Sequence, residues 1–205
     1  MNVPYELVTV AGKADESYPS TNGNRVRLRD FDVFLVRKGA DIKITNIVSK
    51  TFTDNPFAAY SSIDVSRNGK TVRIINTQLA FVTVSIMEQI NELLGGPLNT
   101  ALPALLTGDL QFSPDSAEYA RLLDDGFIDA WSQIRKNKGF TSSQTYDLLN
   151  VNSTLSRRDI YIFYRNKKDI NIKSISRVGI DLSSRTRTGL WPSNHVGISS
   201  NIYIK

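Results

Sequence analysis

Three short polar segments follow apolar runs and hold side chains that could do chemistry. They are Asn76-Thr77-Gln78-Leu79, Gly108-Asp109-Leu110-Gln111 and Pro192-Ser193-Asn194-His195. The last contains the only histidine of the chain, the side chain that exchanges protons most readily near neutral pH. A carboxylate and an imidazole could transfer protons, and the amides could donate hydrogen bonds to an anion. Taken singly, each segment is more often an ordinary turn after a strand than a functional site.

The apolar runs around these segments predict the strands that position them. A β-branched run after the turn Asn68-Gly69 predicts a strand over 71–76, and a short buried run predicts one over 104–107 that Gly108 stops. Further strands are expected at 31–36, 160–164, 170–178 and 196–204. Functional residues should lie at the ends of these strands and in the loops that follow them.

Two segments have the pattern of amphipathic helices. Apolar residues at three- and four-residue spacing run from Ile86 to Leu94, and Gly95-Gly96-Pro97 ends the pattern. Ser113-Pro114-Asp115 predicts an N-cap with proline at the first helical position, for a helix that continues to Gly126. Strands that alternate with helices indicate an α/β or α+β sheet protein with helices outside.

Composition excludes several classes of protein and of site. The 205 residues are 40% hydrophobic and 22% charged, and no linker divides them, which predicts a single domain over 1–205. The absence of cysteine rules out disulfides, thiolate zinc sites and cysteine nucleophiles. No apolar run is long enough for a membrane span, and the first residues have no signal-peptide pattern, so we expect a soluble chain.

The positive charge of the chain is concentrated in its C-terminal third. The net charge is +5, yet residues 135–187 contain twelve Lys/Arg against four acidic residues. Such a segment is either an ordinary solvated surface or a rim that faces phosphate groups, for example in nucleic acid. Spacing alone favours neither interpretation.

Several segments, in one order along the chain, resemble the endonuclease/exonuclease/phosphatase family, and its bacterial members in particular. They are residues 71–79, 105–111 with Ser113-Pro114, 126–131, 156–164 and 189–197. The resemblance covers about two thirds of the chain, from Val72 to the C-terminus. It implies an α+β fold, a four-layer sandwich of two mostly antiparallel sheets with helices outside. It also implies a phosphoesterase site that uses Mg²⁺ or Mn²⁺.

The same resemblance assigns roles to individual residues. Asp109 and His195 match the family motifs, Asp109 as the group that positions or deprotonates water and His195 as the group that contacts phosphate or transfers a proton. Gln78 stands where the family has histidine, and Gln111 where it has asparagine. Asn194 stands where the family has a metal-side carboxylate, which removes a negative charge.

Asp159 departs from the family pattern in its position. Arg158-Asp159-Ile160-Tyr161 reads like the family's Arg-Ile-Asp-Tyr with two residues exchanged. A shift of one residue within a strand sends a side chain to the opposite face. The sequence therefore predicts that Asp159 cannot orient His195 unless a local bulge restores its direction.

The family's N-terminal motifs are not found. Its members begin with a strand bearing an asparagine, and a second strand ends in a metal-binding glutamate. Glu6 and Glu16 lack that motif. We therefore expect that two strands and the main metal carboxylate are missing.

Three hypotheses follow. In the first, the chain is a metal-dependent phosphoesterase in which Asp109, His195, Gln111, Gln78 and Asp159 do the chemistry. Arg158, Arg185 and Arg187 then bind a phosphate-containing substrate or nucleic acid. In the second, it is a non-catalytic relative that binds phosphate or nucleic acid and needs no metal. In the third, it is a truncated fragment. Four of the six aligned site positions differ from the family pattern, which indicates a degraded site.

Overall fold

The computed structural model describes residues 4–12, 16–19, 24–28, 31–80, 85–142, 144–145, 147–166 and 168–205. The chain divides into two compact units, Met1–Leu106 and Thr107–Lys205. Strands predominate over helices, so the secondary structure is α+β, as the sequence predicts. Among the described residues, no helix is both long and apolar enough to cross a membrane.

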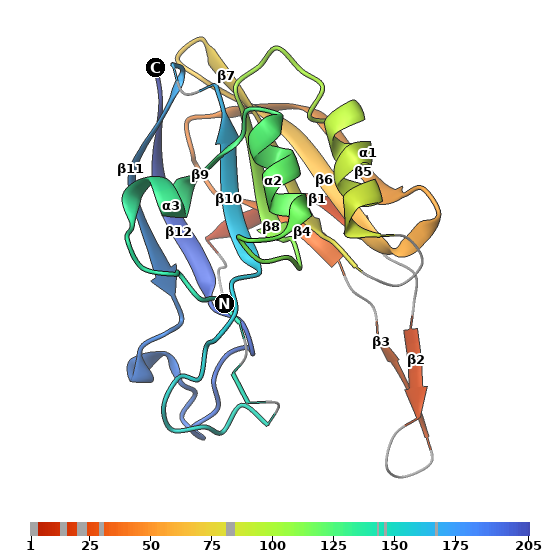
Figure 1. Ribbon diagram of the computed structural model, residues 1–205, viewed down its shortest axis with the longest axis vertical. Coiled ribbons are helices and arrows are strands. Elements are labelled where there is room, and N and C mark those ends of the chain that lie inside the picture. The colour runs from red at the N-terminus through yellow and green to blue at the C-terminus, as the bar shows by residue number, and fades with distance from the viewer. Residues whose placement is uncertain are drawn as a thin grey trace. The chain divides into compact units, whose positions relative to one another are not determined.

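The largest sheet has six strands in the order β5-β6-β7-β8-β10-β9. In the first unit, β5 (Lys43–Phe52), β6 (Asn55–Arg67) and β7 (Lys70–Gln78) pair antiparallel (Figure 1). Asn68 and Gly69 join β6 to β7 with φ values of 51° and 74°. Two positive φ angles in a two-residue turn match the twist of the flanking strands, which is why Asn-Gly predicts a hairpin here. The predicted strand at 71–76 is confirmed as part of β7.

Helix α1 (Ile86–Gly95) confirms the first predicted helix. Ser85 and Glu88 form a capping box, in which each side chain accepts a hydrogen bond from the other's backbone N–H. The buried face consists of Ile86, Gln89, Ile90, Leu93 and Leu94. At the turn that follows β5, the backbone N–H of Thr53 donates to Glu92 Oε2 at 2.8 Å.

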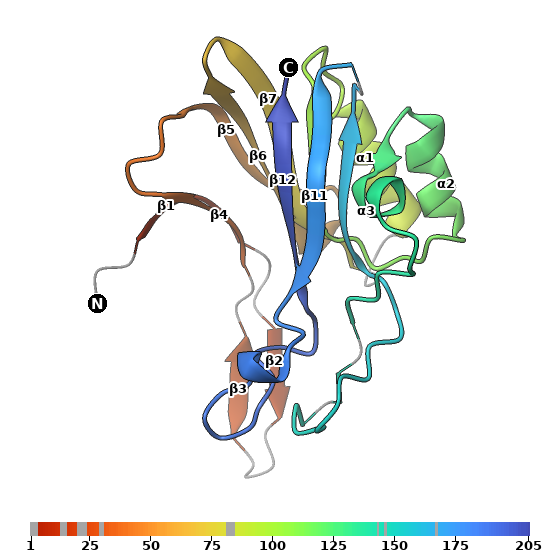
Figure 2. The same cartoon turned by 90° about the vertical axis from the view of Figure 1, so that its left-hand side faces the viewer.

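Two antiparallel ribbons complete the first unit. β1 (Tyr5–Gly12) pairs with β4 (Phe31–Arg37) (Figure 2). This ribbon contacts β5, β6 and β7. β2 (Glu16–Pro19) pairs with β3 (Arg25–Leu28). The predicted strand at 31–36 is therefore confirmed.

The second unit contains two further antiparallel pairs. β10 (Ile160–Arg165) pairs with β9 (Ile128–Asp129), and β11 (Ile170–Val178) pairs with β12 (Gly197–Ile204), which confirms the predicted C-terminal strands. The helices are α2 (Ala117–Asp124), α3 (Ala130–Ile134) and the 3₁₀ turn η1 (Leu182–Ser184). An aromatic cluster of Phe112, Tyr119, Tyr161 and Phe163 packs with ring centroids 5.1 to 6.4 Å apart.

Two predicted boundaries are wrong. Strand β8 (Ala104–Asp109) continues through Gly108, so Asp109 is its last residue. Ser116 caps α2 in place of Ser113, because its hydroxyl accepts the Tyr119 N–H at 3.2 Å. Ser113 instead lies in the preceding turn, where its carbonyl accepts the Ser116 N–H at 3.1 Å.

Candidate active site

Three acid–base side chains from distant parts of the second unit lie together. Asp109 ends β8, Asp159 directly precedes β10, and His195 lies two residues before β12. One ligand atom from each lies within 4.8 Å of those of the other two. His195 Nδ1 is 3.9 Å from Asp109 Oδ2. The structure thus brings together three of the residues selected from the sequence.

The backbone after β8 holds Asp109 in place. Gln111 has a φ of 59°, in the left-handed region that non-glycine residues seldom adopt. Its Nε2 donates to Asp109 Oδ2 at 3.2 Å, and its backbone also hydrogen-bonds to this carboxylate. Gln111 therefore contacts the candidate water-activating group directly, as a hydrogen-bond donor.

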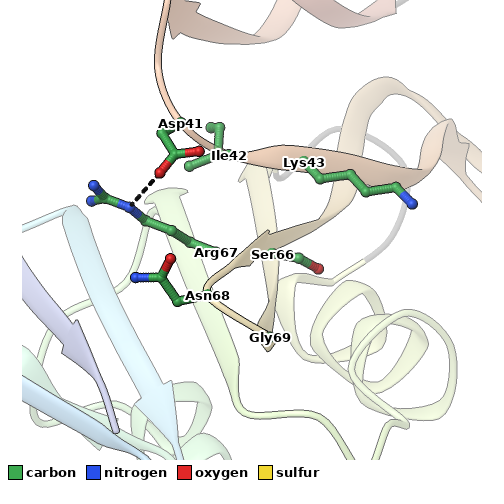
Figure 3. Close-up of a pocket in the computed structure, with 7 residues that line it drawn as sticks. All are labelled: Asp41, Ile42, Lys43, Ser66, Arg67, Asn68 and Gly69. Atoms are coloured by element: carbon green, nitrogen blue, oxygen red, sulfur yellow. Dashed lines mark ion pairs between the residues drawn. The ribbon is translucent and has the colours of Figure 1, made fainter.

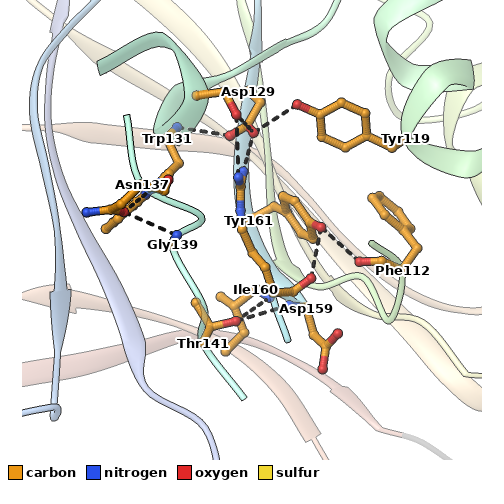
Figure 4. A network of polar contacts seen from close by, with 12 residues as sticks. Phe112, Tyr119, Asp129, Trp131, Asn137, Gly139, Thr141, Asp159, Ile160 and Tyr161 are labelled. Atoms are coloured by element: carbon orange, nitrogen blue, oxygen red, sulfur yellow. Dashed lines mark hydrogen bonds and ion pairs between the residues drawn. The ribbon is translucent and has the colours of Figure 1, made fainter. Parts of the chain in front are cut away.

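A short segment, Thr141-Ser142, holds Asp159. Thr141 Oγ1 accepts the backbone N–H of Asp159 at 3.0 Å, and Ser142 Oγ donates to Asp159 Oδ2 at 2.6 Å (Figure 4 shows Thr141 and Asp159). Arg157 adds a second donor to the same oxygen, also at 2.6 Å. Asp159 precedes β10, so strand alternation does not set its direction. Its carboxylate reaches the cluster despite the exchanged residue order.

The same segment holds His195. The backbones of Ser142 and His195 form an isolated antiparallel bridge, and the Val196 N–H donates to the Thr141 carbonyl at 2.8 Å. No sequence motif pointed to Thr141 or Ser142. Their position in the sequence, far from both Asp109 and His195, carries no periodic signal.

Burial disfavours the ionised form of Asp109. Its side chain is 15% exposed, and desolvation raises its pKa above the ordinary value. His195, the Gln111 backbone and Arg157 oppose that shift, while the neighbouring Asp159 carboxylate adds to it. Among the described residues, Asp109 Oδ1 and His195 Nδ1 are buried polar atoms without a hydrogen-bond partner. The cluster therefore has one carboxylate oxygen and one imidazole nitrogen that are free to contact a ligand.

Comparison with known proteins finds similar solved structures but no similar sequence family. No family model matches the chain, and no curated protein matches it. Among solved structures, D. rerio TDP2 complexed with single-strand DNA product is 21% identical with a TM-score of 0.66, over 98% of this chain and 77% of that one. An endonuclease/exonuclease/phosphatase protein from Bacteroides vulgatus is 15% identical with a TM-score of 0.68, over 98% and 77%. The mannosyl-6-phosphatase Bt3783 from Bacteroides thetaiotaomicron is 15% identical with a TM-score of 0.65, over 98% and 78%.

The chain has the endonuclease/exonuclease/phosphatase fold. These similarities to solved structures span nearly the whole chain, beyond the two thirds in which the sequence motifs are recognisable.

Within this fold, the expectation for Arg158 needs correction. Its side chain is only 3% exposed and donates to Asp129 Oδ2, and its guanidinium lies over the Tyr161 ring, 4.6 Å from the centroid. It therefore has no open face for a substrate phosphate. The adjacent Arg157 contacts Asp159 instead, and its side chain is 64% exposed. Sequence alone does not show which of two consecutive arginines faces the site.

The other predicted binding residues lie outside the cluster. Arg185 lies over Trp191 at 5.7 Å and donates to the Leu149 carbonyl at 3.2 Å, so its contacts are structural. Arg187 is exposed. The Asn194 side chain is exposed, and its carbonyl accepts the Gln144 N–H at 3.1 Å.

One predicted site residue, Gln78, belongs to the first unit, as does Glu6, which lacks the family's glutamate motif. Gln78 is half-buried at the end of β7, and Glu6 is exposed on β1. The side chain of Glu16 lies outside the described part of the structure.

The first unit also has a surface hollow of about 360 Å³ at the β6–β7 turn (Figure 3). Its lining consists of Asp41, Ile42, Lys43, Ser66, Arg67, Asn68 and Gly69. Arg67 Nε and Asp41 Oδ2 are 3.8 Å apart, and both side chains are well exposed. An exposed ion pair of this kind is worth little energetically, and its groups are not arranged for proton transfer.

The cluster of Asp109, Asp159 and His195 fits a divalent cation. Two carboxylates and an imidazole form a donor set that such ions accept, Mn²⁺ more readily than the oxygen-seeking Mg²⁺. The unpartnered Asp109 Oδ1 and His195 Nδ1 are the atoms available to it. Asn194 offers only a neutral amide.

Proposed function

We propose that the chain is a metal-dependent phosphoric ester hydrolase of the endonuclease/exonuclease/phosphatase family. The observation that carries this proposal is the convergence of Asp109, Asp159 and His195, with ligand atoms within 4.8 Å of one another. The fold supports it, since structures that share it include a sugar phosphatase and a protein that holds a DNA product. Phosphoryl transfer needs mainly positioning and charge stabilisation, and this cluster offers both.

Asp109 is the proposed group that takes a proton from water. Because burial raises its pKa toward the working pH, its ionised carboxylate is a stronger base than an exposed aspartate. Gln111 fixes one carboxylate oxygen by donating to Oδ2. Gln111 is proposed to contribute a further hydrogen bond to the phosphate.

His195 and Asp159 have complementary roles in this proposal. His195 donates a proton or a hydrogen bond to a phosphoryl oxygen. Asp159 is held rigidly by Ser142 and Arg157, so its charge stays at a fixed place beside the imidazole. A cation held by Asp109, Asp159 and His195 would neutralise the charge that develops on the phosphoryl group.

A second candidate function is non-catalytic binding of phosphate or nucleic acid. Amides at Gln78, Gln111 and Asn194 take the places where the resemblance puts a histidine, an asparagine and a carboxylate. Together with the basic segment 135–187, these groups favour binding of an anion without turnover.

The test is an assay of the purified protein on a generic phosphodiester, a generic phosphomonoester and plasmid DNA, with Mg²⁺, Mn²⁺ or EDTA. We expect metal-dependent turnover that His195→Ala and Asp109→Asn abolish. Asp181→Asn is the matched control, because Asp181 is an exposed acid in the same unit. Equal turnover in all four proteins would mean a contaminant. Salt-dependent DNA binding without turnover would refute the proposed hydrolase and support the second candidate function, non-catalytic binding of nucleic acid.

A further inference from the structure

Tyr161 joins the two backbone segments that carry the acidic residues of the cluster. Its side chain is 1% exposed, at the second position of β10. Its hydroxyl lies 2.8 Å from the Phe112 carbonyl (Figure 4) and 2.9 Å from the Arg158 carbonyl. A phenol has one proton to donate, so the two carbonyls share it.

Each of these carbonyls is next to a residue of the site. Phe112 directly follows Gln111, which hydrogen-bonds to Asp109, and Arg158 directly precedes Asp159. The Tyr161 hydroxyl therefore spans the gap between the loop of one carboxylate and the segment of the other. Burial raises the pKa of Tyr161, which keeps the hydroxyl protonated and able to donate.

The side of Tyr161 away from the cluster is also fixed. The Arg158 guanidinium lies over its ring, and Asp129 holds that guanidinium in turn. Asp129 also accepts hydrogen bonds from Tyr119 Oη at 3.0 Å and from the Trp131 N–H at 2.9 Å (Figure 4). Ser132 Oγ donates to it at 2.6 Å. Asp129 therefore accepts from four groups, and a buried carboxylate held by this many donors has little freedom to move.

We infer that Tyr161 is a positioning residue, whose hydroxyl sets the distance between the Asp109 and Asp159 carboxylates. A second tie, from the Leu110 N–H to the Asp159 carbonyl at 2.8 Å, runs beside it. Loss of the hydroxyl leaves that tie and the pairing of β8 with β10, but frees the Gln111-Phe112 loop to shift relative to Asp159. This inference rests on the proposed function for its kinetic consequence, but its structural consequence can be measured without activity.

The test is Tyr161→Phe, which removes one oxygen and keeps the ring. Tyr164→Phe is the matched control, because Tyr164 is buried in the same strand and alternation directs it to the opposite face. We expect kcat to fall between about tenfold and a hundredfold in Tyr161→Phe, as for a displacement of about 1 Å, with KM little changed. Tyr164→Phe should keep both constants.

The single histidine supplies a readout that does not depend on turnover. One imidazole gives one Cε1–H resonance in a proton NMR spectrum, so the signal of His195 is unambiguous. We expect this resonance to move in Tyr161→Phe and to stay in place in Tyr164→Phe. If the wild-type protein has no activity but the resonance still moves in Tyr161→Phe, the proposed function is refuted and the positioning role stands. An unmoved resonance and an unchanged kcat would overturn the positioning role, whatever the wild type does.

Discussion

The buried pair of Arg158 and Asp129 allows a quantitative prediction, because the second unit contains a more exposed pair for comparison. The two side chains are 3% and 2% exposed. In Asp129→Ala, the Arg158 guanidinium would keep only Ser132 Oγ at 3.4 Å and the Tyr161 ring at 4.6 Å. Removal of one partner from a buried pair typically costs about 3 to 5 kcal/mol, because a desolvated charge is left uncompensated. Asp129 also caps α3, which adds about 1 kcal/mol.

We therefore expect Asp129→Ala to lower the free energy of unfolding by roughly 5 kcal/mol, which is comparable to the whole stability of many domains. Asp125→Ala is the control. Asp125 accepts from Arg165 at 2.6 Å, but these side chains are 28% and 23% exposed, so the expected loss is about 1 kcal/mol or less.

The assay is urea unfolding followed by tryptophan fluorescence. The double variant Asp129→Leu with Arg158→Met guards against a protein that does not fold, since it removes both charges and should recover most of the lost stability. If Asp129→Ala shifts the urea midpoint no more than Asp125→Ala does, the reasoning from desolvation is wrong.

Three further predictions use other parts of the molecule. A pKa raised in the folded state means that the ionised Asp109 destabilises the fold at any pH above its ordinary pKa. Asp109→Asn should therefore be more stable than wild type at pH 7, and urea titrations at falling pH should show the gain disappear near pH ~4, where the wild-type carboxyl is protonated in the unfolded chain as well. Gly139→Ala should lower the melting temperature more than Gly39→Ala. Both glycines have positive φ, but a Cβ at position 139 would clash with the Trp131 indole, whereas position 39 is open. Mn²⁺ should raise the melting temperature of the wild type and not that of Asp109→Asn, and an equal rise in both would place the ion elsewhere.

The elements that depend on local pattern could be predicted from the sequence. Helix α1 has apolar residues at helical spacing and a glycine-proline stop, and the Asn68-Gly69 turn has residues that tolerate positive φ. The start of α2 could not be placed, because Ser113 and Ser116 are both good N-caps and only the packed structure shows which hydroxyl meets a free N–H.

In the site, the selection of Asp109, Asp159 and His195 depended on motif order. The direction of Asp159 and the burial of Arg158 depend on where β10 begins, and a shift of one residue decides both. The roles of Thr141 and Ser142 are purely tertiary, so no local pattern indicates them.

The Thr141-Ser142 segment has a consequence for how this site can change. One dipeptide, Thr141-Ser142, holds both Asp159 and His195. These two residues therefore form a single rigid block, and a backbone shift of the dipeptide moves both of them together. Asp109 lies on a different element, the end of β8, and is linked to Asp159 through the Tyr161 hydroxyl and the Leu110 N–H. The site therefore has one adjustable gap, between Asp109 and that block, and substitutions around it should open or close this gap while the pairing of Asp159 with His195 survives.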